Sequence, residues 1–449
     1  MDKKVKAKGT MPQKKVKTKN TLYYRNRQAI RFDFSAEEIS SDGGVVLLDK
    51  LERTHGLLSD FSKRLPDYRD PLRITHSMDK LIKQRVFLQC LGYEDCNDSD
   101  ELSHDPILKE FLEDRLASQP TLSRLENTSD KHAIKDLLEY WVDRYVASID
   151  PTRKDIVIDV DSTDDQTHGH QQLSRFHGYY YHHMYHILLF HDGETGQVIL
   201  PFLRAGNTHT ASGATSLLKR IVQKIRKRFP TMKITLRADS GFSGPGSYHL
   251  AQKMDFEFCI GIPANERLKR LTAEIEAQVK EQYVSKNIKY QEIVGPFLYQ
   301  AKSWDIPQQI WAKVESTGRG LNVRYIASNI DQEGEDIYFG FYVHRGEASE
   351  NRIKELKNMC YADRLSCHSF HANFLRLLFS CLSYELMRLL KDVIAKTNHQ
   401  QAKKWQVHNI RLFLLKIGAC VKTRVRTITV CFSRAFPRQA LFRQVAALC

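Results

Sequence analysis

The spacing of apolar residues changes near residue 150 and divides the chain into a helical part and a mixed part. In residues 21–148 apolar positions recur every three or four residues, as in the predicted helix from Ser77 to Leu91, and this spacing is typical of amphipathic helices. After residue 152 the apolar residues form short β-branched and aromatic runs, which favour strands. The later runs predict strands at 155–162, 184–191, 197–204, 234–239 and 256–262, with helices at 211–229 and 246–253.

The order of these elements predicts the fold class. Residues 152–264 give a strand, a two-strand hairpin, a helix, a strand, a helix and a strand. Three antiparallel strands followed by parallel ones is the order of an α/β sheet of the ribonuclease H-like (retroviral-integrase-like) kind. We expect residues 337–400 to complete this catalytic core with a strand at Tyr338–Val343, a helix at Glu347–Met359 and a long apolar helix.

The net charge narrows the class of partner. The formal net charge is +15 at pH 7, which favours a polyanion such as nucleic acid over an acidic small molecule. No apolar run reaches the roughly 18 residues of a spanning helix, and the lysine-rich start lacks the apolar region of a secretory signal. The nine cysteines are scattered without regular spacing, which suits a reducing compartment. We therefore expect a soluble protein in the cytoplasm.

Three further regions follow from composition and spacing. Residues 1–20 predict a disordered basic arm, and residues 265–336 alternate polar and apolar positions as in a β-rich insertion domain. Residues 401–449 form a basic C-terminal tail, in which Arg424 and Arg426 suit an edge strand or a ribbon that faces DNA. We expect the helical residues 21–148 to bind DNA, with a helix-turn-helix as one hypothesis.

Acidic side chains end two predicted strands and begin a predicted helix. Asp161 lies near the end of the first strand, Asp239 ends the fourth strand, and Glu350 stands at the head of a later helix. Taken singly, each suits a capping role, because Asp and Glu are common in turns and at helix N-termini. Taken together they predict a magnesium site, because Mg²⁺ prefers carboxylate oxygens and a pair of such ions can support phosphodiester cleavage. Asp159 and Glu347 remain alternatives to Asp161 and Glu350.

Longer stretches around these acids carry a family resemblance. They are LGYED at 91–95, LASQPTLSRLEN at 116–127, DVDSTDDQTHGHQ at 159–171, LRADSGF at 236–242 and ENRIKELK at 350–357. In these stretches the chain resembles bacterial insertion-sequence transposases of the DDE group, most closely the insertion-sequence family numbered thirteen-eighty. The resemblance implies that Asp161, Asp239 and Glu350 are the catalytic and metal-binding residues, with Mg²⁺ as cofactor and Mn²⁺ as a substitute.

The resemblance also implies a reaction and its partners. Tyr342, Arg345 and Lys357 match a Tyr-Arg-Glu-Lys signature around Glu350, and a DNA-binding role is expected for them, although Arg345 lies one residue further from Glu350 than in the common pattern. The implied reaction is cut-and-paste transposition, in which the enzyme binds terminal inverted repeats, cleaves DNA and joins the 3′-hydroxyl ends to target DNA. A homodimer in the synaptic complex and association with the bacterial nucleoid are implied as well.

Several alternatives stay open. Trp304 and Trp311 of the insertion can contact DNA by stacking on a flipped base, or they can be buried in the core. Two other functions fit the same acids: a ribonuclease H-like DNA nuclease without strand transfer, and a DNA-binding regulatory derivative of a transposase. A zinc set among the cysteines and histidines of residues 360–371 lacks a C-x-x-C pair.

Overall fold

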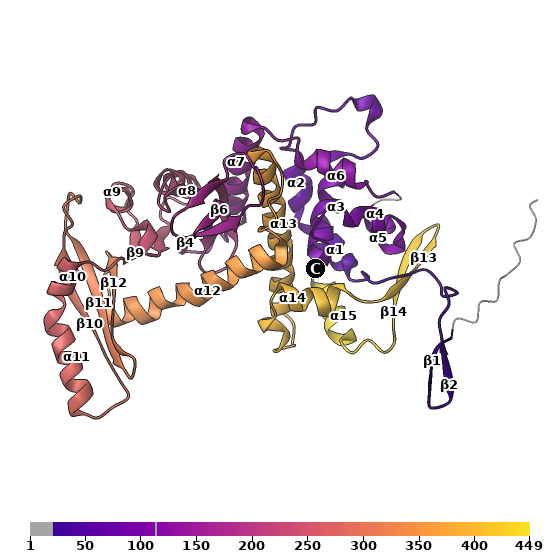
Figure 1. Ribbon diagram of the computed structural model, residues 1–449. Helices are drawn as coiled ribbons and strands as arrows, with labels where there is room; N and C mark the ends of the chain where they lie inside the picture. The colour runs from indigo at the N-terminus through magenta and orange to yellow at the C-terminus, as the bar shows by residue number, and fades with distance from the viewer. Residues whose placement is uncertain (1–20, 113–114) are drawn as a thin grey trace, which may run out of the picture.

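A mixed sheet of nine strands, the central sheet, extends from the middle of the protein to one end of it (Figure 1). The computed structural model describes residues 21–112 and 115–449, so the basic arm expected at 1–20 lies outside the described residues. Neighbouring strands follow the order β10 (Tyr290–Tyr299), β11 (Gln308–Thr317), β12 (Gly320–Ser328), β9 (Glu257–Ile262), β8 (Lys233–Ala238), β4 (Asp155–Gln166), β6 (His182–Asp192) and β5 (Arg175–His177), and β7 (Val198–Ala205) pairs with β6. β4 is antiparallel to β6 and parallel to β8. The predicted α/β class with a mixed sheet is confirmed.

The helices come from both halves of the chain, and a part of them contacts this sheet. The first half contributes α1 (Val45–His55), α2 (Leu57–Ser62), α3 (Met78–Leu91), α4 (Asp98–Glu101), α5 (Pro106–Leu112), α6 (Gln119–Glu126), α7 (Lys131–Ser148) and α8 (Ala214–Arg228). The later helices are α9 (Pro245–Met254), α10 (Glu266–Leu271), α11 (Ala273–Ser285), α12 (Val343–Lys354), α13 (Phe370–Ala395), α14 (Val407–Ile410) and α15 (Gln439–Leu448). Within the described residues no helix is both long and apolar enough to cross a membrane.

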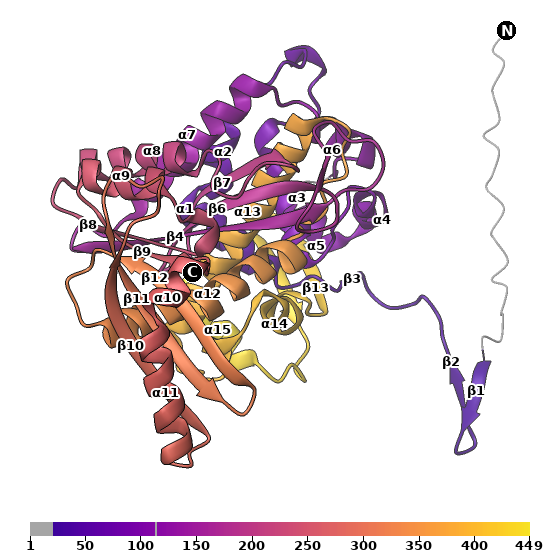
Figure 2. The same ribbon diagram turned by 60° about the vertical axis from the view of Figure 1, so that its left-hand side comes forward.

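Short strands lie outside the central sheet. β1 (Thr21–Arg25) and β2 (Gln28–Arg31) form a hairpin that stands away from the rest of the protein (Figure 2). β13 (Ala419–Arg424) pairs with β14 (Thr427–Phe432) and with β3 (Ile39–Ser40). The expected basic tail is therefore an ordered strand pair followed by α15, and its first strand contacts the start of the helical region.

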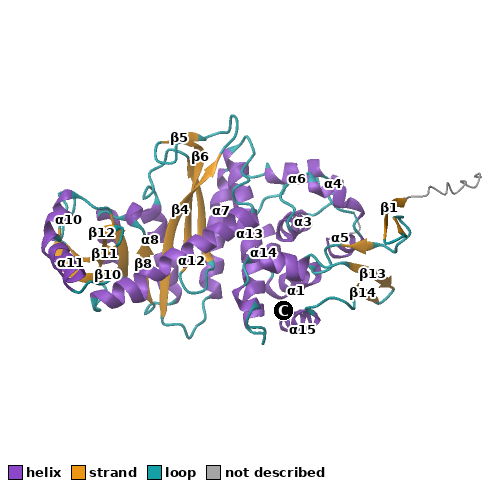
Figure 3. Cartoon of the chain, turned by 60° about the horizontal axis from the view of Figure 1, so that its bottom comes forward, coloured by secondary structure: helices purple, strands orange, loops and turns teal. Residues whose placement is uncertain are grey.

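Alternate residues of the central strands face different layers of helices. Ile158 and Val160 of β4 pack in one core with α7, α8 and α9. On β6, Leu188 belongs to that same core, whereas Leu189 belongs to the core around α13. The odd-numbered residues of β4 face the second layer, where α12 crosses the sheet (Figure 3). This alternation explains how a strand can be apolar on one side and acidic on the other.

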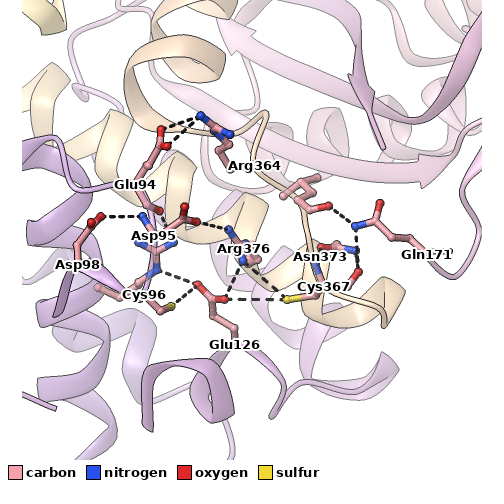
Figure 4. Close-up of polar contacts among 12 residues, drawn as sticks. Glu94, Asp95, Cys96, Asp98, Glu126, Gln171, Arg364, Cys367, Asn373 and Arg376 are labelled. Atoms are coloured by element: carbon pink, nitrogen blue, oxygen red, sulfur yellow. Dashed lines mark hydrogen bonds and ion pairs between the residues drawn. The ribbon is translucent and has the colours of Figure 1, made fainter. Parts of the chain in front are cut away.

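The long helix α13 joins the sheet to the N-terminal helices. Phe379 of α13 packs edge-on against Phe61 of α2, with their ring centroids 6.2 Å apart. Close by, Glu126 of α6 accepts hydrogen bonds from Arg85 Nε at 2.8 Å and from Arg376 Nη1 of α13 at 3.1 Å (Figure 4). The N-terminal helical region therefore shares one hydrophobic core with the C-terminal helices.

One segment differs from the element expected from sequence, and a second contains the expected strands within the central sheet. The alternating residues 338–343 form a helical turn, η4 (Asp336–Tyr342), that leads directly into α12, so the predicted strand there is wrong. Since β12 already has β9 on one side and β11 on the other, the sheet offers no free edge at this point. Residues 265–336 supply β10, β11 and β12, which extend the central sheet through the pairing of β12 with β9.

Candidate active site

The neighbouring strands β4 and β8 bring two of the predicted acids together: Asp161 lies in the middle of β4, and Asp239 directly follows β8. The strands are parallel, and Val160 of β4 pairs with Ala238 of β8. The next residue of each strand is an aspartate, Asp161 or Asp239, so the two carboxylates extend from the same level of neighbouring strands. The apolar residues that precede them fix this register by filling the core on the other face of the sheet.

A guanidinium from α12 links these two carboxylates. Arg345 donates from Nη1 to Asp161 Oδ2 at 3.1 Å, and its Nη2 lies 3.8 Å from Asp239 Oδ2. Burial raises the pKa of Asp161 to about 6; the charge of Arg345 opposes this rise and the charge of Asp239 adds to it. Arg345 therefore compensates only part of the negative charge. Such a carboxylate pair is an environment that a divalent cation stabilises.

Asp159, the alternative to Asp161, has a different environment. Its buried carboxylate accepts hydrogen bonds from Arg237 Nε at 2.7 Å, from Arg237 Nη2 at 2.9 Å and from Arg352 Nη1 at 3.0 Å. Each guanidinium also donates to a backbone carbonyl. Because these charge-assisted hydrogen bonds satisfy both carboxylate oxygens, Asp159 is a partner in a buried ion-pair network. This environment favours Asp161 over Asp159 as the acid available to a ligand.

The sequence predicts Glu350 at the head of a helix, but in the structure it lies within α12, several residues after the helix begins. α12 begins at Val343, and helical turns extend it at both ends, η4 before it and η5 (Glu355–Met359) after it. The side chain of Glu350 is exposed and makes no hydrogen bond or ion pair with a described residue. Among the described residues, no group of three His, Cys, Asp or Glu side chains is close enough together to bind one metal ion. The structure thus brings two of the three acids together and leaves Glu350 on the neighbouring helix.

Lys357 contacts another acid of β4. Its Nζ lies 3.1 Å from Asp164 Oδ1 and 3.2 Å from Thr163 Oγ1, while His182 Nε2 of β6 lies 3.2 Å from Asp164 Oδ2. Burial acts to raise the pKa of Asp164, but the charge and hydrogen bond of Lys357 outweigh it, so the pKa lies below its ordinary value. Sequence reasoning missed Asp164 as a site residue, although it belongs to the acidic run that follows Asp161.

Aromatic side chains between β5 and β6 lie beside the acids. The ring of Tyr180 is 5.1 Å from that of His177 and 6.0 Å from that of His182, centroid to centroid. Burial raises the pKa of Tyr180 to about 12, and the negative charge of nearby aspartates, chiefly Asp164, adds to the rise. Nothing in the sequence around Tyr180 marks it as a neighbour of the acids, because the β5–β6 turn brings it there.

The remaining predicted residues differ in burial. The hydroxyl of Tyr342 occupies the space that a side chain at position 261 would need, so Gly261 allows Tyr342 to approach the end of β8. Trp304 is 9% exposed and packs edge-on between two tyrosines, which favours the core alternative over base stacking. Trp311 is partly buried, and its Nε1 has no hydrogen-bond partner among the described residues.

A family model matches nearly the whole chain. The family described as transposase DDE domain, group 1, matches residues 23–448. No curated protein matches the chain. Among solved structures, the chain is similar to the piggyBac transposase in its cryo-EM synaptic complex with hairpin DNA, with a TM-score of 0.45, 13% identity and coverage of 84% of this chain and 80% of that chain. This structural likeness is weak, and the family match is the informative comparison.

Proposed function

The chain belongs to the transposase DDE domain family, group 1, and on this premise we propose that it cleaves DNA phosphodiester bonds with Asp161, Asp239 and Glu350. The observation that supports this proposal most directly is the meeting of Asp161 and Asp239 at one level of two parallel strands. The strand order β7, β6, β4, β8, β9 supports a ribonuclease H-like core around them.

The donor atoms at the site fit a hard divalent cation. Asp161 and Asp239 offer carboxylate oxygens, and we propose that Glu350, exposed on the helix that crosses β4, supplies the third carboxylate. The raised pKa of Asp161 supports this assignment, because it marks a negative charge that lacks full compensation. Mg²⁺ or Mn²⁺ held there would activate the attacking oxygen and stabilise the leaving oxygen.

We assign the surrounding cations to the DNA backbone. The guanidinium group of Arg345 is planar and lies between the two aspartates. It can pair with a phosphate when those carboxylates hold a cation. Lys357, anchored by Asp164, would contact a phosphate further along β4, and Tyr342 would support the end of β8. In this proposal the protein binds terminal inverted repeats as a homodimer, and the cleaved 3′-hydroxyl attacks target DNA.

Substitution of the acids tests the proposal. We expect Asp161→Asn, Asp239→Asn and Glu350→Gln each to abolish Mg²⁺-dependent cleavage of transposon-end DNA, because each removes one charged oxygen donor. Binding of the same DNA, measured in EDTA, should remain. Asp155→Asn is the matched control, because Asp155 is exposed at the start of β4, six residues before Asp161, and this variant should cleave like wild type. Wild-type cleavage by any of the three variants would remove that residue from the site.

Strand transfer is measured separately with ends that already carry a free 3′-hydroxyl. We expect wild-type protein to join such ends to target DNA and the three acid variants to fail. Cleavage without joining would favour the nuclease alternative, and end binding without either reaction would favour the regulatory alternative.

A further inference from the structure

The N-terminal helical region contains a cavity of about 890 Å³ away from the acids. It lies between the loop before α3, the turn after α4 and the helix α6. In Figure 1 these helices lie at the opposite end of the protein from β10, β11 and β12, with α12 and α13 between. Its basic lining residues include Arg69, Arg73, His104, Lys109, Arg115 and Arg124.

The described lining of this cavity is basic, and two of its arginines, Arg69 and Arg73, already pair with Asp67 and Asp70 of the same loop. Asp100 is the acid among these lining residues, and its Oδ1 already accepts a hydrogen bond from the Gln119 backbone N–H at 2.9 Å. The side chains of Arg115 and Arg124 make no hydrogen bond or ion pair with any residue that the structure describes. Their charges are thus available to a ligand. The pKa of His76 in the same wall is lowered, first by burial and then by the positive charge of Arg115.

The chemistry of the lining indicates which ligand fits. Pockets for small molecules are mostly lined by apolar and aromatic side chains, whereas two guanidinium groups without partners, with further basic side chains around them, suit neighbouring phosphates. The hydroxyl groups of Ser118 and Thr121, which lie 3.2 Å apart and hydrogen-bond to each other, add a neutral donor to the same wall. On the loop that carries Arg69 and Arg73, Tyr68 is 74% exposed and can pack against sugars or bases.

We propose that this cavity binds the phosphodiester backbone of duplex DNA at a distance from the cleavage site. The proposal rests on the proposed function, because it assumes that DNA is the substrate. The cavity would neutralise several phosphates and so increase affinity without reading the sequence. It would hold a transposon end at one point while α12 and β4 engage another.

Salt dependence of DNA binding tests this proposal on the full chain. Binding of a fluorescent duplex is measured by anisotropy in EDTA between about 50 and 200 mM salt, a range in which phosphate contacts dominate the change in affinity. We expect Arg115→Ala/Arg124→Ala to weaken binding to all duplexes and to make the slope of log K against log salt shallower by about two, one for each lost phosphate contact.

A charge-matched variant separates the cavity from net charge. Arg319→Ala/Arg443→Ala removes the same charge from exposed arginines outside the cavity whose side chains make no hydrogen bond or ion pair with described residues, and it should retain the wild-type slope. Thermal unfolding of both variants checks that each is folded. If the two double variants show equal slopes, the cavity proposal is overturned while the proposed function stands. If wild-type protein binds no duplex, both proposals fail.

Discussion

Two aspartates two residues apart on β4 differ because of what faces them. Asp159 meets two guanidinium groups that satisfy both of its oxygens, whereas Asp161 shares one guanidinium with Asp239. Buried charges are stable only when they are paired, so the first aspartate is a structural residue and the second remains open to a cation. Asp165 lies on the same side of the strand and bonds to no guanidinium group. Its buried carboxylate oxygens have no hydrogen-bond partner among the described residues.

This isolation makes the stability of the protein depend on pH. Burial raises the pKa of Asp165 from 3.8 to about 8; Lys357 and Arg376 oppose the rise, and Asp363 and Asp164 add to it. Between these pH values the folded protein keeps a proton that the unfolded chain releases, so the contribution of Asp165 to stability falls as pH rises from about 4 to about 8. We therefore expect Asp165→Asn to raise the thermal unfolding midpoint relative to wild type progressively more from pH 5 to pH 8. A difference that stays constant over this range would contradict the assignment.

At the scale of elements, one helix supplies the cations that one strand requires. Arg345, Arg352 and Lys357 of the helix formed by α12 and η5 contact Asp161, Asp159 and Asp164 of β4. The helix therefore docks on an acidic strand through ion pairs, while the opposite face of the strand docks through apolar contacts. Of these pairs, the one at Asp159 is the most deeply buried.

Loss of the buried carboxylate should weaken this docking. We expect Asp159→Asn to lower the free energy of unfolding by about 3–5 kcal/mol, because the change leaves buried guanidinium groups without a countercharge. Asp155→Asn, at the exposed start of the same strand, should change it by less than about 0.5 kcal/mol. Urea unfolding followed by circular dichroism measures both. Equal stability of the two variants would show that the pair at Asp159 contributes little to docking.

At the scale of the whole molecule, α13 connects the N-terminal helical region to the sheet. Its buried residues contact the N-terminal helices on one side and the sheet on the other, in one continuous core. The hairpin β1–β2 is the exception, because within the described residues its two strands pair with each other alone and expose Leu22, Tyr23 and Tyr24.

Truncation tests whether the rest of the protein depends on the shared core around α13 and not on the hairpin β1–β2. A fragment of residues 152–400 should lose cooperative unfolding and bind hydrophobic dyes, because removal of the N-terminal helices exposes α13. Removal of residues 1–38 should leave the thermal transition of the rest unchanged. Calorimetry and dye binding measure both outcomes, and a cooperative transition in the 152–400 fragment would show that the shared core is dispensable.

The sequence predicted well where local spacing controls structure. The hairpin at residues 192–196 and the order of strands and helices from 155 to 262 follow from period-two and helical patterns, because these patterns reflect burial of one face of each element. The same reasoning misread residues 338–343, whose alternation fits a strand but whose neighbours in the fold leave no edge to pair with. Local pattern also placed Glu350 at a helix start, since nothing in it shows that α12 begins at Val343 and continues the helical turn η4.

By itself, the sequence determined the α/β class, the family and the set of candidate acids, because periodicity and motifs are properties of neighbouring residues along the chain. Only the tertiary structure decided which acids are compensated. Asp159, Asp161 and Asp164 each pair with a cation from a helix almost two hundred residues later in the chain, and Asp159 pairs in addition with Arg237 of β8. The interaction between two charges depends on their distance in space, and these acids and cations come close together only when α12 docks across β4.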